Sequence, residues 1–297
     1  MTNLNKNDYF IDVSAYQEPN AGIYGIPKTI IKVTEGTSWY STRRQQQAET
    51  SQPVGYYHFA RFGGSVGQAQ AEASYFIRML PNKKVKYLVC DYEDSASGDR
   101  NANTQAVLAF MRACRNAGYQ PIFYGYVFYS ANNIDLHAIV REFPKSLWMA
   151  GYAYGYKPKG DYNTVDENTM KSNMAGCGIA DLWPHVRWVQ FTSTGVTPTY
   201  SGSLDKNIVL IGDEGADGLL AQSQGEDIMF TVSAEGRGIA LIVGGSMFSL
   251  LDANDPKVFW QHKERPVPHY QVSAKTFDEM SSKAVNNVAQ DIKKGMK

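Results

Sequence analysis

The chain has 297 residues, of which 43% are hydrophobic and 20% charged, and its formal net charge is zero. This length allows one large domain plus a small one, and the composition is ordinary for a globular protein. The sequence contains no block of basic residues, which argues against binding to nucleic acid or to an anionic membrane surface.

The three cysteines, Cys90, Cys114 and Cys177, have no motif spacing, so we expect neither a disulfide framework nor a metal site, and no cofactor. The N-terminal stretch lacks the basic start and apolar core of a secretory signal peptide. The longest apolar run, "IALIVGG", is too short to span a bilayer. We therefore expect a protein that stays in the cytoplasm where it is made unless something releases it.

Short apolar, β-branched or aromatic runs recur along the chain and predict strands. Several are apolar on both faces, as buried parallel strands are. The eight predicted strands cover residues 9–15, 29–36, 54–60, 85–94, 121–127, 146–153, 186–193 and 204–210.

Helical periodicity appears between these runs. Residues 66–80 and 103–118 each place apolar side chains on one face, and Gly118 is a suitable stop for the second helix. Residues 41–52 are a weaker helix candidate, and residues 154–185 are expected to form a long loop with at most a short helix. The two stripes consist of Ala69, Ala73, Phe76, Ile77 and Leu80, and of Val107, Phe110, Met111 and Cys114.

Eight strands with intervening helices predict an α/β protein built on a β/α barrel whose later helices are incomplete. Active sites in such barrels lie at the C-terminal ends of the strands. Strand ends are also polar simply because they emerge into water, but the whole set favours a shared acidic and aromatic pocket. The polar residues at or near these ends are Asp12, Glu35, His58, Asp91, Glu93, Tyr124, Tyr126, Tyr152 and Gln190, with Asp205 in the last strand.

The stretch "YLVCDYEDS" ends a predicted strand in three carboxylates. Alternation along a strand would place Asp91 and Glu93 on one face, and Tyr92 and Asp94 on the other. Two carboxyls at this separation suit glycoside hydrolysis, in which one donates a proton and the other supports positive charge on the sugar. The spacing is common by chance, and a divalent metal would need further oxygen ligands that do not follow nearby.

The remainder of the chain predicts a linker at residues 213–228 and a small second domain at 229–297. Three strands joined by turns at residues 235–236 and 244–245 precede a helix at 276–294. Thr276 and Glu279 have the spacing of a capping box. The predicted buried stripe of the helix is Phe277, Met280, Ala284, Val288 and Ile292.

Eight segments in order carry a resemblance to a known family: "FIDVSAYQ", "IIKVTEG", "VGYYHFA", "YLVCDYED", "FYGY", "LWMAGY", "WVQFTSTG" and "LDKN". From residue 8 to 212 the chain resembles the glycoside hydrolase family 25 lysozymes, or Chalaropsis-type muramidases. The resemblance implies a flattened (β/α)5(β)3 TIM-like barrel, followed here by a small α+β domain. It also implies cleavage of the β-1,4 bond between N-acetylmuramic acid and N-acetylglucosamine in peptidoglycan, as in phage endolysins that lyse a host.

The resemblance assigns Glu93 as the general acid and Asp91 as its partner, either a nucleophile or an aid to the N-acetyl group of the substrate. Asp12 and Asp205 match two further acidic positions in the pocket. Glu35 suits a pocket role and a structural hydrogen bond equally. The substrate-contacting positions implied by the resemblance are Tyr57, Tyr126, Trp148, Tyr152, Gln190 and, in the first of its two roles, Glu35.

Three alternatives keep other functions open: a peptidoglycan-binding protein that has lost catalysis, a hydrolase of another N-acetylated glycan such as chitin, and a bacterial autolysin. Bacterial peptidoglycan is the expected partner, and residues 229–297 are expected to bind the wall, or else to serve as a structural or self-associating appendage. The stretch "SQGEDIM" is compatible with a ribosome-binding sequence before Met229. It raises the hypothesis of a separately translated 229–297 fragment that associates with the full chain.

Overall fold

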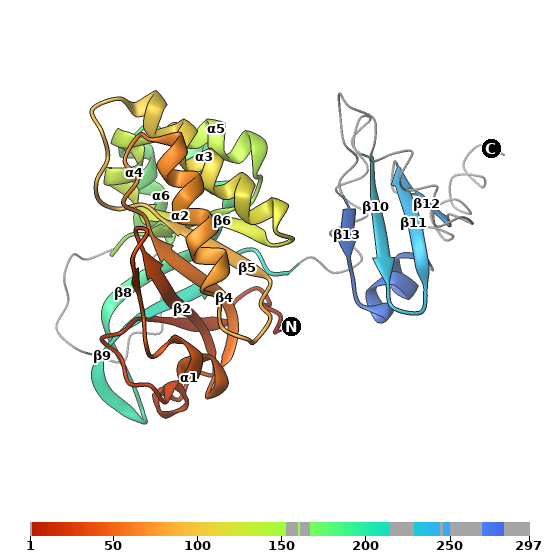
Figure 1. Cartoon of the computed structure of the whole chain (residues 1–297), viewed down its shortest axis with the longest axis horizontal. Helices are drawn as coiled ribbons and strands as arrows, with labels where there is room; N and C mark the ends of the chain where they lie inside the picture. The colour runs from red at the N-terminus through yellow and green to blue at the C-terminus, as the bar shows by residue number, and fades with distance from the viewer. Residues whose placement is uncertain are drawn as a thin grey trace. The chain divides into compact units, whose positions relative to one another are not determined.

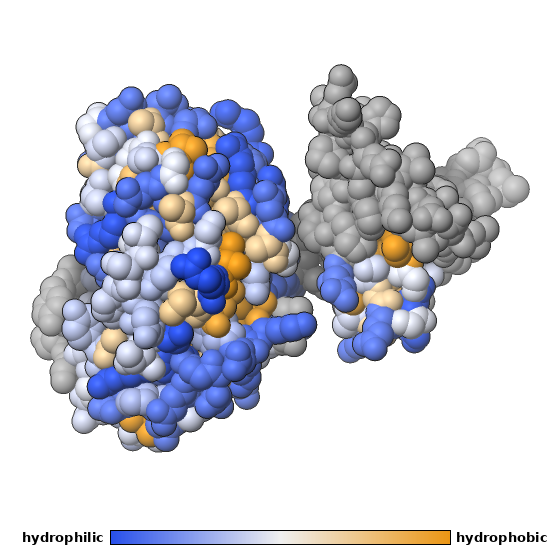
Figure 2. All heavy atoms as spheres, viewed as in Figure 1, coloured by the Kyte–Doolittle hydropathy of each residue, from blue (hydrophilic) through white to orange (hydrophobic). Residues whose placement is uncertain are grey.

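A computed structural model describes residues 2–152, 160, 167–213, 229–243, 246–249 and 269–281 of the chain. The chain divides into two compact units, Met1–Asp213 and Glu214–Lys297. In the described parts, no helix is both long enough and apolar enough to cross a membrane. Figure 2 shows a face of the first unit on which hydrophilic residues predominate and hydrophobic ones form small groups.

The first unit is a closed barrel of eight strands (Figure 1). Neighbouring strands follow the order β1-β9-β8-β7-β6-β5-β4-β2, and β2 pairs with β1 to close the ring. The pairs are parallel from β1 through β2 and β4 to β8, whereas β9 is antiparallel to both β8 and β1. The strands are β1 (Tyr9–Val13), β2 (Lys28–Glu35), β4 (Gln52–Phe59), β5 (Tyr87–Asp91), β6 (Gln120–Tyr126), β7 (Leu147–Ala150), β8 (Val186–Thr197) and β9 (Tyr200–Val209), with the two-residue β3 (Trp39–Tyr40) paired to β2.

Helices cover the outside of the barrel. In α2 and α3 the predicted stripe residues Ala69, Phe76, Phe110 and Cys114 are fully buried, because the spacing of three and four residues keeps them on the face toward the strands. Gly118 ends α3 with a left-handed backbone, as expected. The helices are η1 (Ala21–Tyr24), α1 (Arg44–Glu49), α2 (Val66–Arg78), α3 (Arg100–Asn116), α4 (Val127–Asn133), α5 (Leu136–Glu142), α6 (Glu167–Gly176) and η2 (Ala180–His185).

Two short helices were not predicted from the sequence. The seven-residue helices α4 and α5 are too short to show a clear period, and α5 depends on a local cap in which the Asp135 side chain accepts from the backbone N–H groups of His137 and Ala138. The predicted loop at 154–185 contains both α6 and η2. Its residues 154–159 and 161–166 lie outside the described residues.

The predicted strand at 85–94 is too long. Strand β5 ends at Asp91, and the chain then leaves the sheet. Tyr92 packs into the core, where its ring lies 5.4 Å from that of Phe62 and its hydroxyl donates to the Gly63 carbonyl at 3.1 Å. Ser95 follows with a positive φ of 65°. Strand alternation therefore does not govern the side chains after Asp91.

Large aromatic side chains fill the interior of the barrel. Phe10, Tyr87, Trp148 and Trp188 are nearly inaccessible and meet edge to face, with ring centroids 4.8–5.7 Å apart. Edge-to-face contacts of this kind add to the hydrophobic gain of burial. This packed interior forms a firm base for side chains at the C-terminal ends of the strands.

The last residue of the first unit, Asp213, fastens the chain to the start of the barrel. Its carboxylate accepts from the Leu4 backbone N–H at 2.8 Å and from Lys86 Nζ at 2.9 Å, and the Tyr87 hydroxyl also donates to it. The Asp213 side chain is only 7% exposed. Asp213, predicted as the first residue of the linker, is therefore an anchored part of this unit.

Replacing Asp213 with alanine should destabilise the barrel by about 2–4 kcal/mol, because Lys86 and the Leu4 N–H would lose a buried partner. Urea unfolding followed by tryptophan fluorescence measures this change. The control Asp181→Ala removes a carboxylate that is 65% exposed and should cost less than about 1 kcal/mol. Equal stability of the two variants would contradict the anchoring role.

The second unit has a four-stranded sheet in the order β12-β11-β10-β13. Its strands are β10 (Met229–Ala234), β11 (Gly238–Val243), β12 (Ser246–Ser249) and β13 (His269–Gln271), of which the last, parallel to β10, was not predicted. The predicted turn at Glu235–Gly236 is present, and the one at 244–245 lies outside the described residues.

Residues 274–281 of the second unit are helical. Phe277 and Met280 are buried against Val232 and Ile242, as the predicted stripe requires. The helix is capped by Ser273, whose hydroxyl accepts from the Thr276 N–H at 3.1 Å, and not by the predicted Thr276. The linker from 214 to 228 and the remaining stripe residues Ala284, Val288 and Ile292 lie outside the described residues.

Candidate active site

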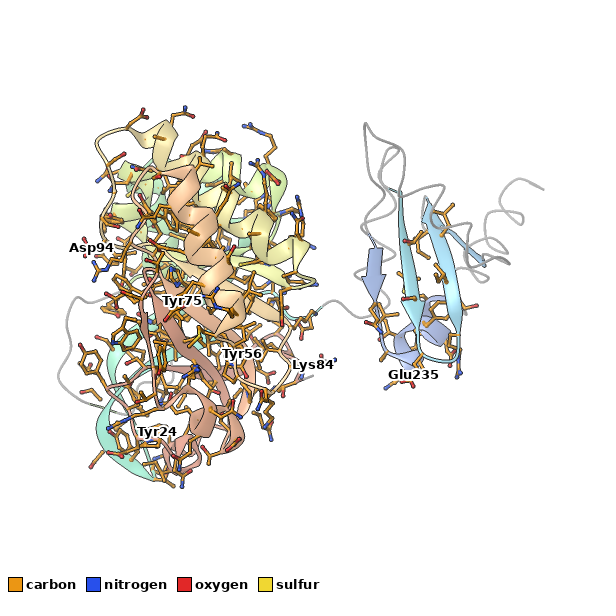
Figure 3. All side chains as sticks on the ribbon, in the orientation of Figure 1. Tyr24, Tyr56, Tyr75, Lys84, Asp94 and Glu235 are labelled. Carbon is orange, nitrogen blue, oxygen red and sulfur yellow. The ribbon has the colours of Figure 1, made fainter. Side chains whose placement is uncertain are left out.

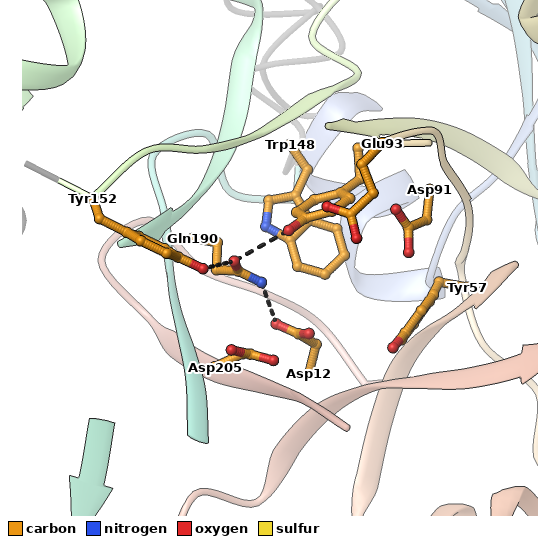
Figure 4. Close-up of a pocket in the computed structure, with 9 residues that line it drawn as sticks. Asp12, Tyr57, Asp91, Glu93, Trp148, Tyr152, Gln190 and Asp205 are labelled. Atoms are coloured by element: carbon orange, nitrogen blue, oxygen red, sulfur yellow. Dashed lines mark hydrogen bonds between the residues drawn. The ribbon is translucent and has the colours of Figure 1, made fainter. Parts of the chain in front are cut away.

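A pocket of about 200 Å³ opens at the C-terminal ends of the barrel strands (Figure 4). Four carboxyl groups and four aromatic rings converge on it. Eight of the ten residues predicted for the site are in its lining. The lining residues are Asp12, Tyr57, Asp91, Glu93, Tyr124, Trp148, Tyr152, Gln190 and Asp205.

Strand pairing brings together residues that are far apart in the sequence. Asp12 on β1 is directly opposite Asp205 on β9, and Asn207 on β9 is opposite Gln190 on β8. Because alternate residues of a strand point to the same side, Asp205 and Asn207 share a face. Three adjacent strands thus place two acids and two amides on one wall of the barrel.

Hydrogen bonds fix this wall. Asp12 Oδ2 accepts from Asn207 Nδ2 at 2.7 Å and from Gln190 Nε2 at 3.1 Å. Gln190 Oε1 in turn accepts from the hydroxyls of Tyr152 at 2.7 Å and Tyr124 at 3.1 Å, as the dashed lines of Figure 4 show. The orientation of Asp12 is therefore set by groups from β6, β8, β9 and the end of β7.

Burial disfavours the charged forms of the acids on this wall. It raises the pKa of Asp12 to about 7, against the lowering effect of the Asn207 and Gln190 hydrogen bonds. Burial likewise raises the pKa of Asp205 well above its usual range, and the adjacent charges of Asp12 and Glu93 raise it further. At neutral pH Asp12 and Asp205 together therefore carry less negative charge than two fully ionised carboxylates would.

Asp12→Asn should make the protein more stable above neutral pH. The folded-state pKa of Asp12 lies above its unfolded value, so its contribution to stability is present below about pH 4 and is lost as pH rises through about 7. Asparagine lacks this titration, and we expect an advantage for the variant on the order of 2–4 kcal/mol at pH 8 that vanishes near pH 4. Urea unfolding at both pH values checks this. A constant difference between the two proteins would contradict it.

Asp91 and Glu93 face the pocket from another side. Asp91 is buried, and its Oδ1 has no hydrogen-bond partner among the described residues. Burial first, and then the Glu93 charge, raise the pKa of Asp91 well above its usual range, whereas the Lys32 charge lowers it. Glu93 as a whole residue is exposed, but its carboxyl lies among protein atoms that partly exclude water, which raises its pKa.

Two predicted contact residues, Tyr126 and Glu35, are outside the pocket lining. Tyr126 is the residue before α4, where its side chain is 41% exposed. Glu35 is paired with Lys32 at 2.7 Å and with Arg61 at 2.7 Å. Arg61 also pairs with Asp94, which lies at the edge of the first unit in Figure 3 and is not among the residues that line the pocket.

The structure adds two residues to those assigned from the sequence. Tyr124 was recognised only as polar at a strand end, and Asn207 of "LDKN" was not assigned, although strand alternation places it on the face of Asp205. His58 is not in the lining. It is a buried structural histidine, hydrogen-bonded to Thr34 and Glu72 at 2.8 Å each.

Residues 11–200 match the sequence profile of Glycosyl hydrolases family 25, which is more than half of the chain. The chain belongs to this family. The predicted membership of family 25 is thereby confirmed.

Curated relatives of this family 25 chain come from phages. Over 217 residues it is 50% identical to a protein of Streptococcus phage B30 named D-alanyl-L-alanine endopeptidase, covering 72% of this chain and 45% of that protein. Over 218 residues it is 39% identical to the lysozyme of Streptococcus phage Cp-1, covering 72% and 57%. The chain spans about half the length of the curated relatives it matches.

A crystal structure of the modular Cpl-1 endolysin complexed with a peptidoglycan analogue is similar to this family 25 chain, with a TM-score of 0.57 and 33% identity. The similarity covers 83% of this chain and 69% of that one. Together with the closed eight-stranded sheet, it confirms the predicted α/β barrel.

Proposed function

We propose that the barrel is a lysozyme of the endolysin type, which hydrolyses the β-1,4 bond between N-acetylmuramic acid and N-acetylglucosamine in bacterial peptidoglycan. The observation that carries the proposal is the convergence of Asp91 and Glu93, in different environments, on one aromatic-lined pocket of a family 25 barrel. Glycoside hydrolysis needs two carboxyls whose environments separate their roles.

Glu93 acts as the general acid in this proposal. Desolvation raises its pKa, which favours the protonated form that a general acid needs. It is also the more exposed member of the pair and can reach the oxygen of a glycosidic bond in the pocket. Lys32 opposes the shift, which keeps the carboxyl able to release its proton.

Asp91 is the partner of Glu93. Its buried Oδ1 has no partner among the described residues, and a buried acceptor without a donor is costly. An N–H of a bound substrate would satisfy it. We therefore favour a role in which Asp91 holds and polarises the acetamido group of the substrate, so that this group stabilises the sugar carbon. Direct attack by Asp91 is the alternative.

The ring-lined walls suit a sugar. Tyr57, Tyr124, Trp148 and Tyr152 present apolar faces with polar edges to the pocket, as carbohydrate sites require. Asp12 and Asp205 would hold sugar hydroxyls and set the charge around the acid pair.

The name of the phage B30 relative suggests peptide cleavage as a second activity, but this chain spans only 45% of that protein. Among the described residues, the pocket lining contains no histidine, cysteine, serine or lysine that could serve as a nucleophile or its base. Retention of four acids in one pocket also disfavours a binding protein without catalysis. The chemistry of the pocket thus supports glycoside hydrolysis.

The proposal is tested by incubating purified peptidoglycan with the full chain and measuring soluble reducing sugar. Release by the wild type is the expected result. No release, with the protein retained in the wall pellet, would leave a binding protein and overturn the proposal.

Residues 229–297 form the part that we propose binds the cell wall, because a second module on an insoluble substrate raises the local concentration of the first. Co-sedimentation of the Glu93→Gln chain with walls should fall when these residues are deleted.

We propose further that the enzyme acts on the wall after release from the host cytoplasm. Self-association and a separate fragment starting at Met229 stay predictions. If expression of the intact gene gives a single protein band on a gel, and Met229→Ile does not change it, the separate fragment does not exist.

A further inference from the structure

Asn207 contacts the carboxylate of Asp12 but is not itself in the pocket lining. It is fully buried on β9, and its amide bridges two lining residues. Its Nδ2 donates to Asp12 Oδ2 at 2.7 Å, and its Oδ1 accepts from the Trp148 indole Nε1 at 2.9 Å.

The direction of these hydrogen bonds is fixed by chemistry. An indole N–H can only donate, so the amide oxygen of Asn207 must face Trp148 and its NH2 group must face Asp12. Gln190 has the same sense in the structure, with its Oε1 accepting from two tyrosine hydroxyls and its Nε2 donating to Asp12. Asp12 Oδ2 is thus an acceptor of two N–H groups and cannot itself carry a proton there.

Asp205 lies directly opposite Asp12 in the β1–β9 pair, and both carboxyls line the pocket. Two like charges at directly opposite positions of neighbouring strands repel each other. One proton held between the two carboxyls would relieve this repulsion, because the pair would then carry a single negative charge. With Oδ2 of Asp12 closed by the amides, that proton has to lie on Oδ1 of Asp12 or on Asp205.

We propose that Asn207 is a positioning residue that keeps Oδ2 of Asp12 unprotonated. It thereby confines the proton shared by Asp12 and Asp205 to Oδ1 of Asp12 or to Asp205. The indole N–H of Trp148 orients this amide by donating to its oxygen. The inference deepens the proposed function, on which it rests: it assigns a proton-sharing acid pair, with one negative charge, to the wall facing Asp91 and Glu93.

Other ionisable groups also surround this pair, and the test has to separate the titration of Asp12 from theirs. Asp91 and Glu93 from β5 and the following loop act on Asp12 or Asp205 electrostatically. The phenols facing it are Tyr57 on β4, Tyr124 on β6 and Tyr152 after β7.

The test uses the full chain with ¹³C-labelled aspartate and follows the side-chain carboxyl signals by NMR against pH. Signals of the pair are assigned with Asp12→Asn and Asp205→Asn. Because the Asn207 hydrogen bond favours the charged form of Asp12, Asn207→Leu should move the Asp12 midpoint upward by about one pH unit. It should also lower kcat roughly 10- to 100-fold with little change in KM.

The matched control is Thr197→Val. It removes another buried hydrogen bond of the β8–β9 hairpin, from the Thr197 hydroxyl to the Tyr24 carbonyl at 2.8 Å, outside the pocket. It should leave the Asp12 midpoint and kcat unchanged. If Asn207→Leu does not fold, the isosteric Asn207→Asp decides, since a second carboxyl opposite Oδ2 should also move the midpoint upward.

An unchanged Asp12 midpoint in the folded Asn207 variants would overturn the inference and leave Asn207 a structural residue. The NMR titration requires no substrate. Failure of the proposed function would instead appear as a wild type that does not cleave peptidoglycan, so the two failures are distinguishable.

Discussion

Glu93→Gln should lower kcat on peptidoglycan by about 10²- to 10⁴-fold while leaving binding to the wall intact. Glutamine has nearly the same shape as glutamate but cannot donate a proton of suitable acidity to the leaving oxygen. The alkaline side of the pH profile should vanish with it, because in the wild type activity falls as pH rises through the raised pKa of Glu93. Initial rates from pH 4 to 9 measure both effects.

The neighbouring acid supplies the control for this prediction. Asp94 is exposed and paired with Arg61, outside the pocket lining. Asp94→Asn should change kcat less than about threefold, as expected of an exposed ion pair. Loss of activity in both variants to the same extent would indicate that the loop, and not the Glu93 proton, is what matters.

Asp91→Asn is the second change with a large expected effect, a loss of about 10²- to 10³-fold in kcat. The amide fills the same space on β5 but cannot take on the negative charge that would stabilise a cationic transition state. The double variant with Glu93→Gln should lose less than the product of the two single effects, because the two groups act in one step. Single-turnover rates on a defined muropeptide oligomer measure these factors. A near-wild-type rate for Asp91→Asn would contradict the assignment.

The two roles open to Asp91 differ in their substrate dependence. If Asp91 acts through the acetamido group, wild-type activity should be lost on glycan whose muramic acid residues have been de-N-acetylated. If Asp91 itself attacks the sugar carbon, the de-N-acetylated glycan should still be cleaved, and a covalent sugar adduct on Asp91 should be detectable by intact mass.

The buried strands were predictable because their signal is local. Runs such as "TIIKV" are apolar on both faces, and β2, β4 and β8 begin within about two residues of their predicted starts. Helices α4 and α5 were missed because each has only seven residues, too few to show a repeating apolar stripe. The Asp135 side chain caps α5, whereas α4 has no side-chain cap.

The site was predictable in its members more than in its geometry. The pairing of Asp12 with Asp205 depends on the β1–β9 register, which joins the first and last strands of the barrel. Neither local sequence contains a signal for this register. Strand alternation would place Tyr124 and Tyr126 on the same face, but β6 ends at Tyr126 and α4 follows directly. Only Tyr124 lines the pocket. Local pattern cannot foresee such a change of path.

The acid pairs are held at a cost in stability. Burial raises the pKa values of Asp12, Asp91 and Asp205, so each destabilises the folded state increasingly as pH rises through its folded value. Groups that are kept in spite of such a cost often serve function, which is consistent with the proposed chemistry.

The most direct test of the central claim is mass spectrometry of the borohydride-reduced fragments that the full chain releases from purified peptidoglycan. The account predicts new reduced N-acetylmuramic acid ends, which are absent when Glu93→Gln replaces the wild type. Reduced N-acetylglucosamine ends, or cleaved peptides without new glycan ends, would contradict it.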